Sequence, residues 1–259
     1  MKSESDLFDE FVTVVRRLRK DCPWDSTQTH QSLAHLLIEE AYETTDSIEN
    51  QNFDELKKEL GDLLLHVVLH AIIAKEDNRF SLSEVLSSIT AKLIRRHPHI
   101  FAATDVSSVD EVKQNWELIK MKEGRSSVLE GVPDSMPALL QAYRIQDKVS
   151  SLGFDWADRR EVWAKIEEEL AEFREAEGQS PDRAEEELGD LLFSLTNYAR
   201  FIGLNPETAL ARTNRKFKSR FRHVENRMRE ENLPWKTTPL DVMDQFWNEA
   251  KKSESRLKS

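Results

Sequence analysis

Two helices and the turn between them are encoded by the stretch IEEELAEFREAEGQSPDRAEEELGDLL, which spans residues 166–192. Gly178 is typical of a helix C-terminus, and Ser180 followed by Pro181 is typical of the start of the next helix. Because the turn is short, the two helices should pack antiparallel against each other. The predicted helices cover residues 159–177 and residues 181–203.

Each predicted helix carries two carboxylates three residues apart. Glu169 and Glu172 share one face of the first helix, because residues i and i+3 are neighbours on a helical surface. Glu187 and Asp190 share one face of the second helix in the same way. If the helices pack antiparallel, the four carboxylates converge and repel one another. Oxygen ligands of this kind suit a hard divalent cation, so the pattern predicts a metal site, with Mg²⁺ the commonest ion beside phosphate substrates.

The first half of the chain repeats this arrangement. The string ELGDLL occurs at residues 59–64 and again, unchanged, at residues 187–192, and EEAYE at residues 39–43 parallels EELAE at residues 168–172. The two halves should therefore fold into related helical structures. The equivalent carboxylates of the first half are Glu40, Glu43, Glu59 and Asp62.

Composition predicts an all-α protein. Seven Gly and eight Pro are few for 259 residues, and 33% charged with 39% hydrophobic residues suits amphipathic helices with solvated outer faces. No stretch requires a strand. The expected architecture is two tandem helical-bundle domains related by the internal repeat. A cluster of Gly, Ser and Pro residues between the halves predicts a linker at residues 123–137, with domains at residues 1–122 and 138–259.

The net charge of −11 disfavours binding to nucleic acids, because an acidic surface repels polyanions. No apolar stretch approaches the roughly 18 residues that a membrane span requires. A single cysteine cannot form an intramolecular disulfide, and the N-terminal residues show no signal-peptide pattern. We therefore expect a cytoplasmic protein whose partners include neither a nucleic acid nor a membrane.

Glutamate-rich helices are often only solvated surfaces, and one E-E-x-x-E string alone would indicate nothing more. Its duplication and its pairing with E-L-G-D favour a functional site. Gly61 and Gly189 interrupt apolar helices at matching positions, at a cost of about 1 kcal/mol each relative to Ala. A di-iron bundle would need E-x-x-H motifs and a zinc hydrolase would need H-E-x-x-H, and the sequence contains neither.

The order E-E-x-x-E, a gap of about fifteen residues, then E-x-x-D resembles the MazG family of all-α nucleoside triphosphate pyrophosphohydrolases. Three further segments resemble that family: KDCPWD at residues 20–25, RRHPH at residues 95–99 and GFDW at residues 153–156. The resemblance covers nearly the whole chain, in the tandem arrangement of the full-length members. It implies the helical pyrophosphohydrolase fold in both halves.

The resemblance also implies an activity. A nucleoside triphosphate, ribo or deoxy, would be hydrolysed between the α and β phosphates to the monophosphate and pyrophosphate, which would remove aberrant or surplus nucleotides. Mg²⁺ would be the cofactor, with Mn²⁺ as a substitute, and the protein would be a homodimer. The C-terminal domain would carry the main catalytic site.

Residue by residue, the resemblance implies roles in the C-terminal half. The implied metal ligands are Glu169, Glu172, Glu187 and Asp190. The implied nucleotide contacts are Lys165, Glu168, Lys216, Arg220 and Trp247. The expected catalytic residues are Glu168, Glu169 and Glu172, with Glu168 as the candidate that orients or deprotonates the attacking water. A second, weaker set in the N-terminal half is Glu39, Glu40, Glu43, Glu59, Asp62, Lys92 and Arg96.

The basic residues fit phosphate chemistry independently of the resemblance. Lys165 lies on the same helix face as the first two C-terminal carboxylates, one turn earlier. Lys216 and Arg220 form an i,i+4 pair that can hold phosphate oxygens and stabilise a pyrophosphate leaving group. Trp247 could stack on any base. In the first half Leu36 occupies the position of Lys165, so the C-terminal site is expected to do most of the hydrolysis. Three roles stay open for the N-terminal site: weak binding of metal or nucleotide, action on another substrate, or a part mainly in dimer assembly.

Two other functions stay open at this stage. A non-catalytic helical module that binds nucleotides or a protein partner would explain the duplicated bundles, but not four convergent carboxylates beside paired cations. A narrow pyrophosphohydrolase for dUTP or phosphoribosyl-ATP would share the fold and act on one nucleotide only.

Overall fold

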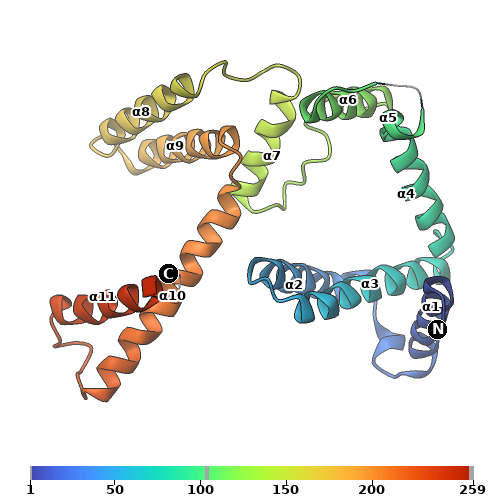
Figure 1. Cartoon of the computed structure of the whole chain (residues 1–259), viewed down its shortest axis with the longest axis horizontal. Helices are drawn as coiled ribbons and strands as arrows, with labels where there is room; N and C mark the ends of the chain where they lie inside the picture. Colours follow the sequence, from blue (N-terminus) through green and yellow to red (C-terminus); the bar gives the residue numbers. More distant parts are fainter. Residues whose placement is uncertain (1, 103–104, 257–259) are drawn as a thin grey trace. The chain divides into compact units, whose positions relative to one another are not determined.

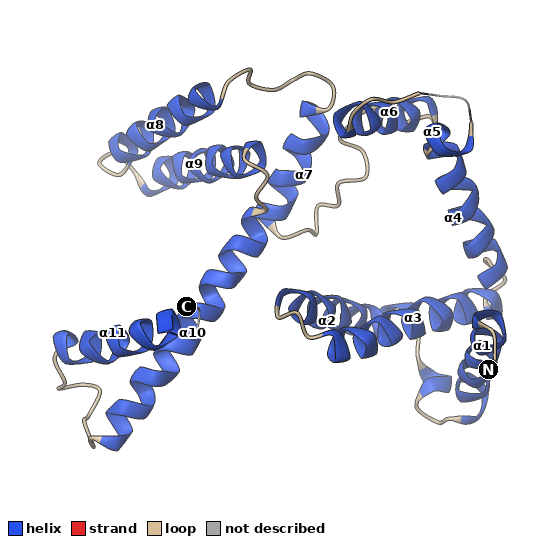
Figure 2. Cartoon of the chain, viewed as in Figure 1, coloured by secondary structure: helices blue, strands red, loops and turns tan. Residues whose placement is uncertain are grey.

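The computed structural model describes residues 2–102 and 105–256, and every regular element within them is a helix (Figures 1 and 2). No strand occurs in these two stretches. The all-α prediction is therefore confirmed. Within the same residues, no helix is both long and apolar enough to cross a membrane.

The chain forms two compact units, residues 1–105 and residues 106–259. The helices described in unit 1 are α1 (Glu4–Asp21), η1 (Asp25–Thr27), α2 (His30–Glu49), α3 (Phe53–Glu76), α4 (Leu82–Arg96) and α5 (Pro98–Phe101). Those of unit 2 are α6 (Val109–Lys122), α7 (Ala138–Ser150), α8 (Arg159–Ala176), α9 (Pro181–Phe201), α10 (Pro206–Glu230) and α11 (Leu240–Arg256).

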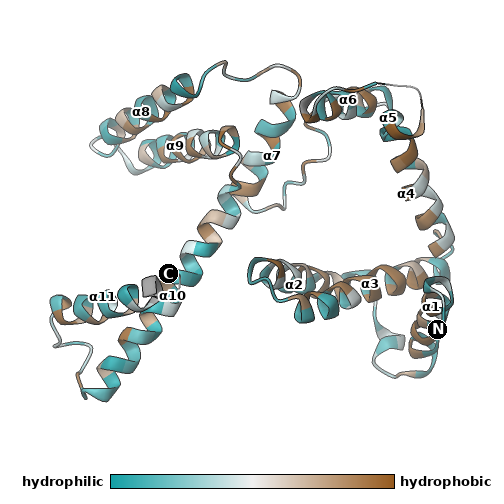
Figure 3. Ribbon diagram, in the orientation of Figure 1, coloured by the Kyte–Doolittle hydropathy of each residue, from teal (hydrophilic) through white to brown (hydrophobic). Residues whose placement is uncertain are grey.

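A hairpin of α2 and α3 forms the centre of unit 1, and α1 packs against α3. The hydrophobic core lies where these three helices meet, and Figure 3 shows hydrophobic residues along much of α3. Removing such side chains from water is the main favourable term of folding, at about 25 cal/mol per Å² of apolar surface. The buried core residues are Val12, Val15, Leu33, Val68, Leu69 and Ile73.

Unit 2 is built from two hairpins. α8 packs against α9 and α10 packs against α11, while α7 contacts both α9 and α10. A buried hydrophobic cluster lies within the α10–α11 hairpin, where Val224, Met228 and Phe246 meet. The α8–α9 hairpin is the structural equivalent of α2–α3, because it carries the repeated sequence.

α6 belongs to unit 2, although it precedes the predicted linker. Lys148 of α7 is 3% exposed; its Nζ donates to the carbonyl of Val128 at 2.8 Å and pairs with Glu117 of α6 at 3.3 Å. A buried ammonium is tolerated only when it is paired in this way, so these contacts hold α6 and the following segment to α7. The division at a linker of residues 123–137 stays a prediction, whereas the compact units divide between residues 105 and 106.

The helix boundaries around the central turn of unit 2 agree with those predicted. α8 ends at Ala176, and α9 begins at Pro181 with the Ser180 hydroxyl accepting a hydrogen bond from the first turn. Asn52 caps α3 in the same way. Gly203 follows the end of α9 with a φ of +74°, a conformation that glycine adopts without strain.

A pair of side chains joins the start of α2 to α3 in unit 1. His30 Nδ1 and His70 Nδ1 lie 2.8 Å apart, so one ring must donate the proton that the other accepts. Burial, together with the neighbouring His30 and His66, lowers the pKa of His70. At the matching positions of unit 2, Arg159 Nε donates to the hydroxyl of Tyr198 at 2.7 Å.

We predict that unit 1 loses stability in mild acid through this histidine pair. A histidine whose pKa is lowered by folding stabilises the fold above its ordinary pKa near 6.5, and that contribution is lost as the pH falls through the folded value. In the double variant His30→Arg/His70→Tyr, the urea concentration at the unfolding midpoint should fall less between about pH 7.5 and 5.5 than in the parent protein. Circular dichroism measures the midpoint. An unchanged slope would contradict this expectation.

Candidate functional site

The α8–α9 hairpin brings three acidic side chains together. One carboxylate oxygen from each of Glu169, Glu187 and Asp190 lies within 4.8 Å of the other two. Glu169 and Glu187 are 6% and 5% exposed, while Asp190 is exposed. Glu172, the fourth predicted ligand, is exposed on the next turn of α8 and is not part of this group. The structure thus joins three of the four predicted ligands.

Two cations neutralise the buried members of this group. Lys165 Nζ lies 2.6 Å from Glu169 Oε1 and 2.9 Å from Glu168 Oε1. Hydrogen bonds to these carboxylates, foremost to Glu169, hold the pKa of Lys165 well above its usual value. Arg183 Nη2 lies 2.8 Å from Glu187 Oε1.

The donor set fits a hard divalent cation. All three donors are carboxylate oxygens, the ligand type that Mg²⁺ and Mn²⁺ prefer. Ligands on opposite sides of Mg²⁺ lie about 4.2 Å apart, twice the usual metal–oxygen distance of about 2.1 Å. The three oxygens lie within 4.8 Å of one another, which is close enough for one ion to be held after small side-chain movements.

A cavity of about 620 Å³ opens beside these carboxylates, with walls from α7, α8 and α9. Ile145, Val162 and Phe193 contribute to an apolar wall, and Glu169 and Asp190 also line the cavity. The volume lies within the range of small-molecule sites, roughly 300–1,000 Å³. An apolar chamber with acidic groups at its wall can hold an organic ligand beside a metal ion.

The loop between α7 and α8 closes one side of the cavity. Gly153 has a φ of +90°, a conformation that glycine allows and other residues rarely adopt. Asp155 pairs with Arg200 of α9 at 2.5 Å, and Arg200 also donates to Oδ1 of Asn197. This network ties the loop to α9, and the exposed Trp156 follows Asp155 at the cavity wall.

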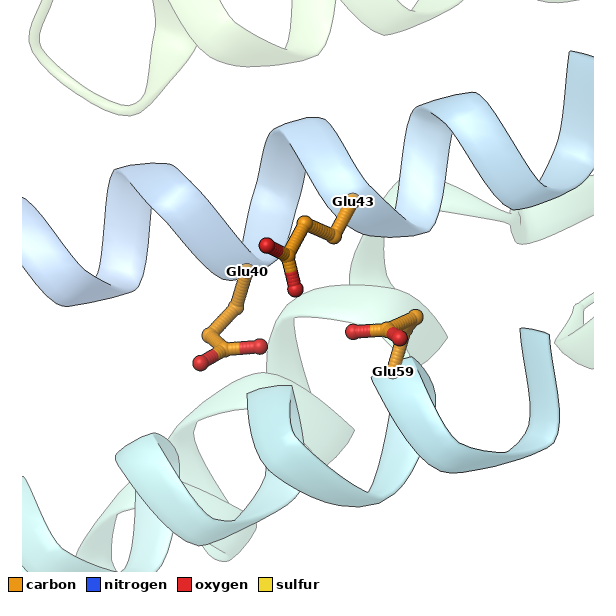
Figure 4. A group of neighbouring side chains, drawn as sticks. All are labelled: Glu40, Glu43 and Glu59. Atoms are coloured by element: carbon orange, nitrogen blue, oxygen red, sulfur yellow. The ribbon is translucent and has the colours of Figure 1, made fainter. Parts of the chain in front are cut away.

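Unit 1 contains an equivalent carboxylate group. Figure 4 shows Glu40 and Glu43 of α2 pointing toward Glu59 of α3, and one oxygen from each lies within 4.8 Å of the other two. Burial raises the pKa of Glu59, and the negative charge of Glu43 adds to this effect. Burial also raises the pKa of Glu40, with Asp62 as the next cause. Asp62, one turn after Glu59 on α3, is exposed and outside the group.

The two units differ in the residues that compensate these charges. Where unit 2 has Lys165 beside its carboxylates, unit 1 has Leu36, and where unit 2 has Arg183, unit 1 has Glu55. Leu36 packs against the hydrophobic core of unit 1. The acidic group of unit 1 therefore lacks the two cations that its counterpart contacts.

The units also differ in what fills the space behind the carboxylates. Asn197 and Arg200 of α9 line the cavity in unit 2. Their counterparts on α3 are Leu69, which is buried in the core of unit 1, and Ile72, which packs against that core. A hydrophobic core thus occupies in unit 1 the position at which unit 2 keeps a ligand-sized cavity.

The other predicted residues of unit 2 lie on the α10–α11 hairpin. Trp247 packs against its hydrophobic cluster, with the guanidinium of Arg220 5.6 Å from the ring centroid. Lys216 is exposed on α10. None of these three lines the cavity, so their contact with a nucleotide stays a prediction. In unit 1, the remaining predicted residues are the exposed Glu39 on α2 and the half-buried Lys92 and Arg96 on α4.

Several cavity residues have no individual role that the sequence predicts. The GFDW motif at residues 153–156 resembles a family segment as a whole, and its glycine lies at the turn that the structure shows. Asn197 and Arg200 could have been found by comparing the halves, since apolar residues replace both in the first half. Gln146 of α7 carries no such signal, because a glutamine on an amphipathic helix usually faces water.

Comparisons with known proteins match both units. The MazG nucleotide pyrophosphohydrolase domain matches residues 28–101 and residues 159–225, so the predicted tandem repeat is confirmed. The chain is 43% identical over 256 residues to the nucleoside triphosphate pyrophosphohydrolase/pyrophosphatase MazG of Thermotoga maritima, with 97% of this chain and 98% of that protein covered. It is 40% identical over 259 residues to the nucleoside triphosphate pyrophosphohydrolase of Escherichia coli (strain K12), and the match covers 96% of this chain and 98% of that protein. Bacillus subtilis YabN, an uncharacterized protein, is 42% identical over 266 residues, which cover 99% of this chain and 54% of YabN.

We predict that Arg200 holds the loop at the cavity. The Arg200 side chain is only 10% exposed and forms an ion pair with Asp155. Arg200→Met removes this ion pair, so the loop should open more often. Amide hydrogen exchange measured by mass spectrometry should become several-fold faster in residues 151–158 and unchanged in α10. Arg174→Met, on the exposed side of α8, is the matched control and should alter neither region. Unchanged exchange in the loop of Arg200→Met would refute the prediction.

Proposed function

The chain belongs to the MazG family of nucleotide pyrophosphohydrolases, and from this premise we propose that the carboxylates of its α8–α9 hairpin form the Mg²⁺ site at which nucleoside triphosphates are hydrolysed. The reaction of the family converts a nucleoside triphosphate to the monophosphate and pyrophosphate. Ribo- and deoxynucleotides are both proposed as substrates. The biological role would be the removal of aberrant or surplus nucleotides.

The observation that carries this proposal is the acidic group at the wall of a ligand-sized cavity. Glu169, Glu187 and Asp190 would hold the ion. When bound, Mg²⁺ offsets the charge of the triphosphate and lowers the pKa of a coordinated water. Glu172 lies one turn further along α8 from Glu169 and would complete the ligand set after a rotation of its exposed side chain.

We propose that Lys165 contacts the triphosphate. Its Nζ lies beside Glu169 and Glu168. Its ammonium group would donate to phosphate oxygens and stabilise the leaving pyrophosphate. Glu168 is exposed beside the ligands, where its carboxylate can orient or deprotonate the attacking water.

The cavity supplies a place for the nucleoside. Phe154 is 82% exposed and Trp156 is 43% exposed, although both are aromatic and both line the cavity. Aromatic rings that are exposed in the free protein can stack on a base at low cost, and stacking accepts any base. This arrangement supports a broad substrate range over the narrow dUTP or phosphoribosyl-ATP alternative.

We propose that unit 1 binds metal or nucleotide weakly and contributes little to turnover. Its acidic group can coordinate a cation, but Leu36 cannot contact phosphate. The hydrophobic core that includes Leu69 occupies the position of the nucleoside cavity. The two halves would therefore share the metal-binding hairpin and differ in catalysis.

The substrate and the net charge bear on where the protein acts and on what it binds. Nucleoside triphosphates are made and used in the cytoplasm, and we propose that the protein acts there. The net charge of −11 supports a protein that does not bind nucleic acids.

Matched substitutions in the two hairpins test the catalytic assignment. Glu187→Gln removes one charged ligand and should lower kcat by roughly 100-fold or more, because metal stabilisation of the transition state is worth several kcal/mol. Glu59→Gln, at the identical and equally buried position of unit 1, should change kcat less than about 3-fold. Steady-state release of pyrophosphate with ATP and dATP provides the measurement. A large loss of kcat in Glu59→Gln with a small loss in Glu187→Gln would instead assign the main catalytic site to unit 1.

The products identify the bond that is broken. Chromatography of reactions with Mg²⁺ should give monophosphate and pyrophosphate from several nucleotides, and EDTA should stop the reaction. A nucleoside diphosphate with orthophosphate would place the cleavage at the wrong bond. Turnover of a single nucleotide would favour the narrow enzyme, and no turnover would favour a non-catalytic binding module.

We propose that the protein is a homodimer, because matching apolar ridges are exposed on the paired helices. On α9, Leu188, Leu192 and Leu195 are 41–45% exposed at i, i+4 and i+7 spacing. The ridge recurs on α3 at the equivalent positions Leu60, Leu64 and Val67, which are 40–52% exposed. Two copies of such a ridge can pack against each other about a two-fold axis, the commonest symmetry of homo-oligomers.

Light scattering after size exclusion tests the dimer. The parent should have roughly twice the 30.1 kDa mass of one chain, and Leu192→Glu should shift it toward the monomer, since burying an unpaired charge in an interface is costly. Leu210→Glu, at an equally exposed leucine of α10, serves as the control. A monomeric parent, or a Leu192→Glu variant that stays dimeric, would argue against this interface.

A further inference from the structure

Gln146 of α7 is a buried polar residue in the cavity wall that the reaction described above does not use. It is 5% exposed and lines the cavity together with Phe193 and Ser194 of α9. A glutamine can be buried to this degree without penalty only if both ends of its amide find hydrogen-bond partners.

The packing fixes the direction of this amide. Gln146 Nε2 donates to the backbone carbonyl of Phe193 at 2.8 Å. A carbonyl oxygen only accepts, so the NH₂ group must point at Phe193 and Oε1 must be the other end. Oε1 is buried and has no hydrogen-bond partner among the described residues. Gln146 therefore holds an unpaired, oriented acceptor with almost no exposed surface, and a small shift of the cavity wall is needed for a ligand to reach it.

Ser194 adds a second group that can accept, but not donate, a hydrogen bond at the cavity wall. Its hydroxyl donates to the carbonyl of Leu191 at 2.9 Å, and the side chain is 7% exposed at the cavity wall. Because that single proton is committed to the backbone, Ser194 Oγ can only accept from a ligand. Both buried polar groups thus prefer a ligand that brings a hydrogen-bond donor.

We propose that Gln146 is a specificity-determining residue, whose Oε1 accepts a hydrogen bond from a donor group of the nucleoside bound in the cavity. The donor is an N–H or O–H, either an exocyclic amine of the base or a hydroxyl of the sugar. This inference rests on the proposed function of the same site. It adds that nucleotides without the donor are discriminated against, because they leave the buried oxygen unpaired.

Substrate analogues that each lack one donor test the proposal in the parent protein. The series compares ATP with purine riboside triphosphate, which lacks the exocyclic amine, and with 2′-deoxy-ATP and 3′-deoxy-ATP, which each lack one hydroxyl. One deletion should lower kcat/KM by roughly 5- to 150-fold, the effect of leaving a buried acceptor unpaired. The position of that effect separates the base amine from the sugar hydroxyls. Equal kcat/KM across the series overturns the proposal.

A double-mutant cycle then assigns the discrimination to Gln146. Gln146→Met keeps the length of the side chain and removes the acceptor, so the penalty for the sensitive analogue should fall to less than about 3-fold. Gln141→Met is the matched control on α7, since Gln141 is absent from the cavity wall, and its discrimination should equal that of the parent. Discrimination that persists in Gln146→Met also overturns the proposal. Failure of this inference leaves ATP hydrolysis intact, whereas failure of the proposed function abolishes turnover of the whole series.

Discussion

Repulsion among carboxylates that face one another between two paired helices is the constraint on which each half of the chain depends. Glu59 and Glu187 occupy identical sequence positions, both are buried, and both have acidic neighbours from the partner helix within 4.8 Å. Buried negative charges must be paired, protonated or bound to a cation. Unit 2 pairs them with Lys165 and Arg183, and in unit 1 the pKa of Glu59 rises instead.

The same hairpin is used in two ways because its surroundings differ. In unit 1 the residues behind the acidic group are apolar, and Leu69 is buried in a core that α1, α2 and α3 build together. In unit 2 the equivalent residue is Asn197, and the space is an open cavity. Unit 2 places a hydrophobic cluster in a separate hairpin, α10–α11. A site that must admit a ligand cannot also be filled by a core.

The cavity of unit 2 combines an apolar chamber with polar groups whose directions are fixed by hydrogen bonds. The carbonyl of Phe193 orients the amide of Gln146, and the guanidinium of Arg200 orients that of Asn197. Fixed polar groups discriminate between ligands at little entropic cost, because they need no ordering when the ligand binds. In the proposed function, the charged residues of the acidic group would provide the reactivity, and these uncharged groups would provide the selection.

The sequence by itself determined the helices, the hairpin and the acidic positions. Ser180 and Pro181 begin α9 as predicted, and the i,i+3 spacing of carboxylates predicted which of them share a face, because caps and helical periodicity are local properties. The repeated motifs were also enough to indicate the family. Only the tertiary structure decided that Glu172 lies outside the acidic group, that Trp247 packs in a different hairpin, and that Gln146 is buried in the cavity wall. These facts depend on side-chain directions and on contacts between helices distant in sequence, which no local pattern encodes.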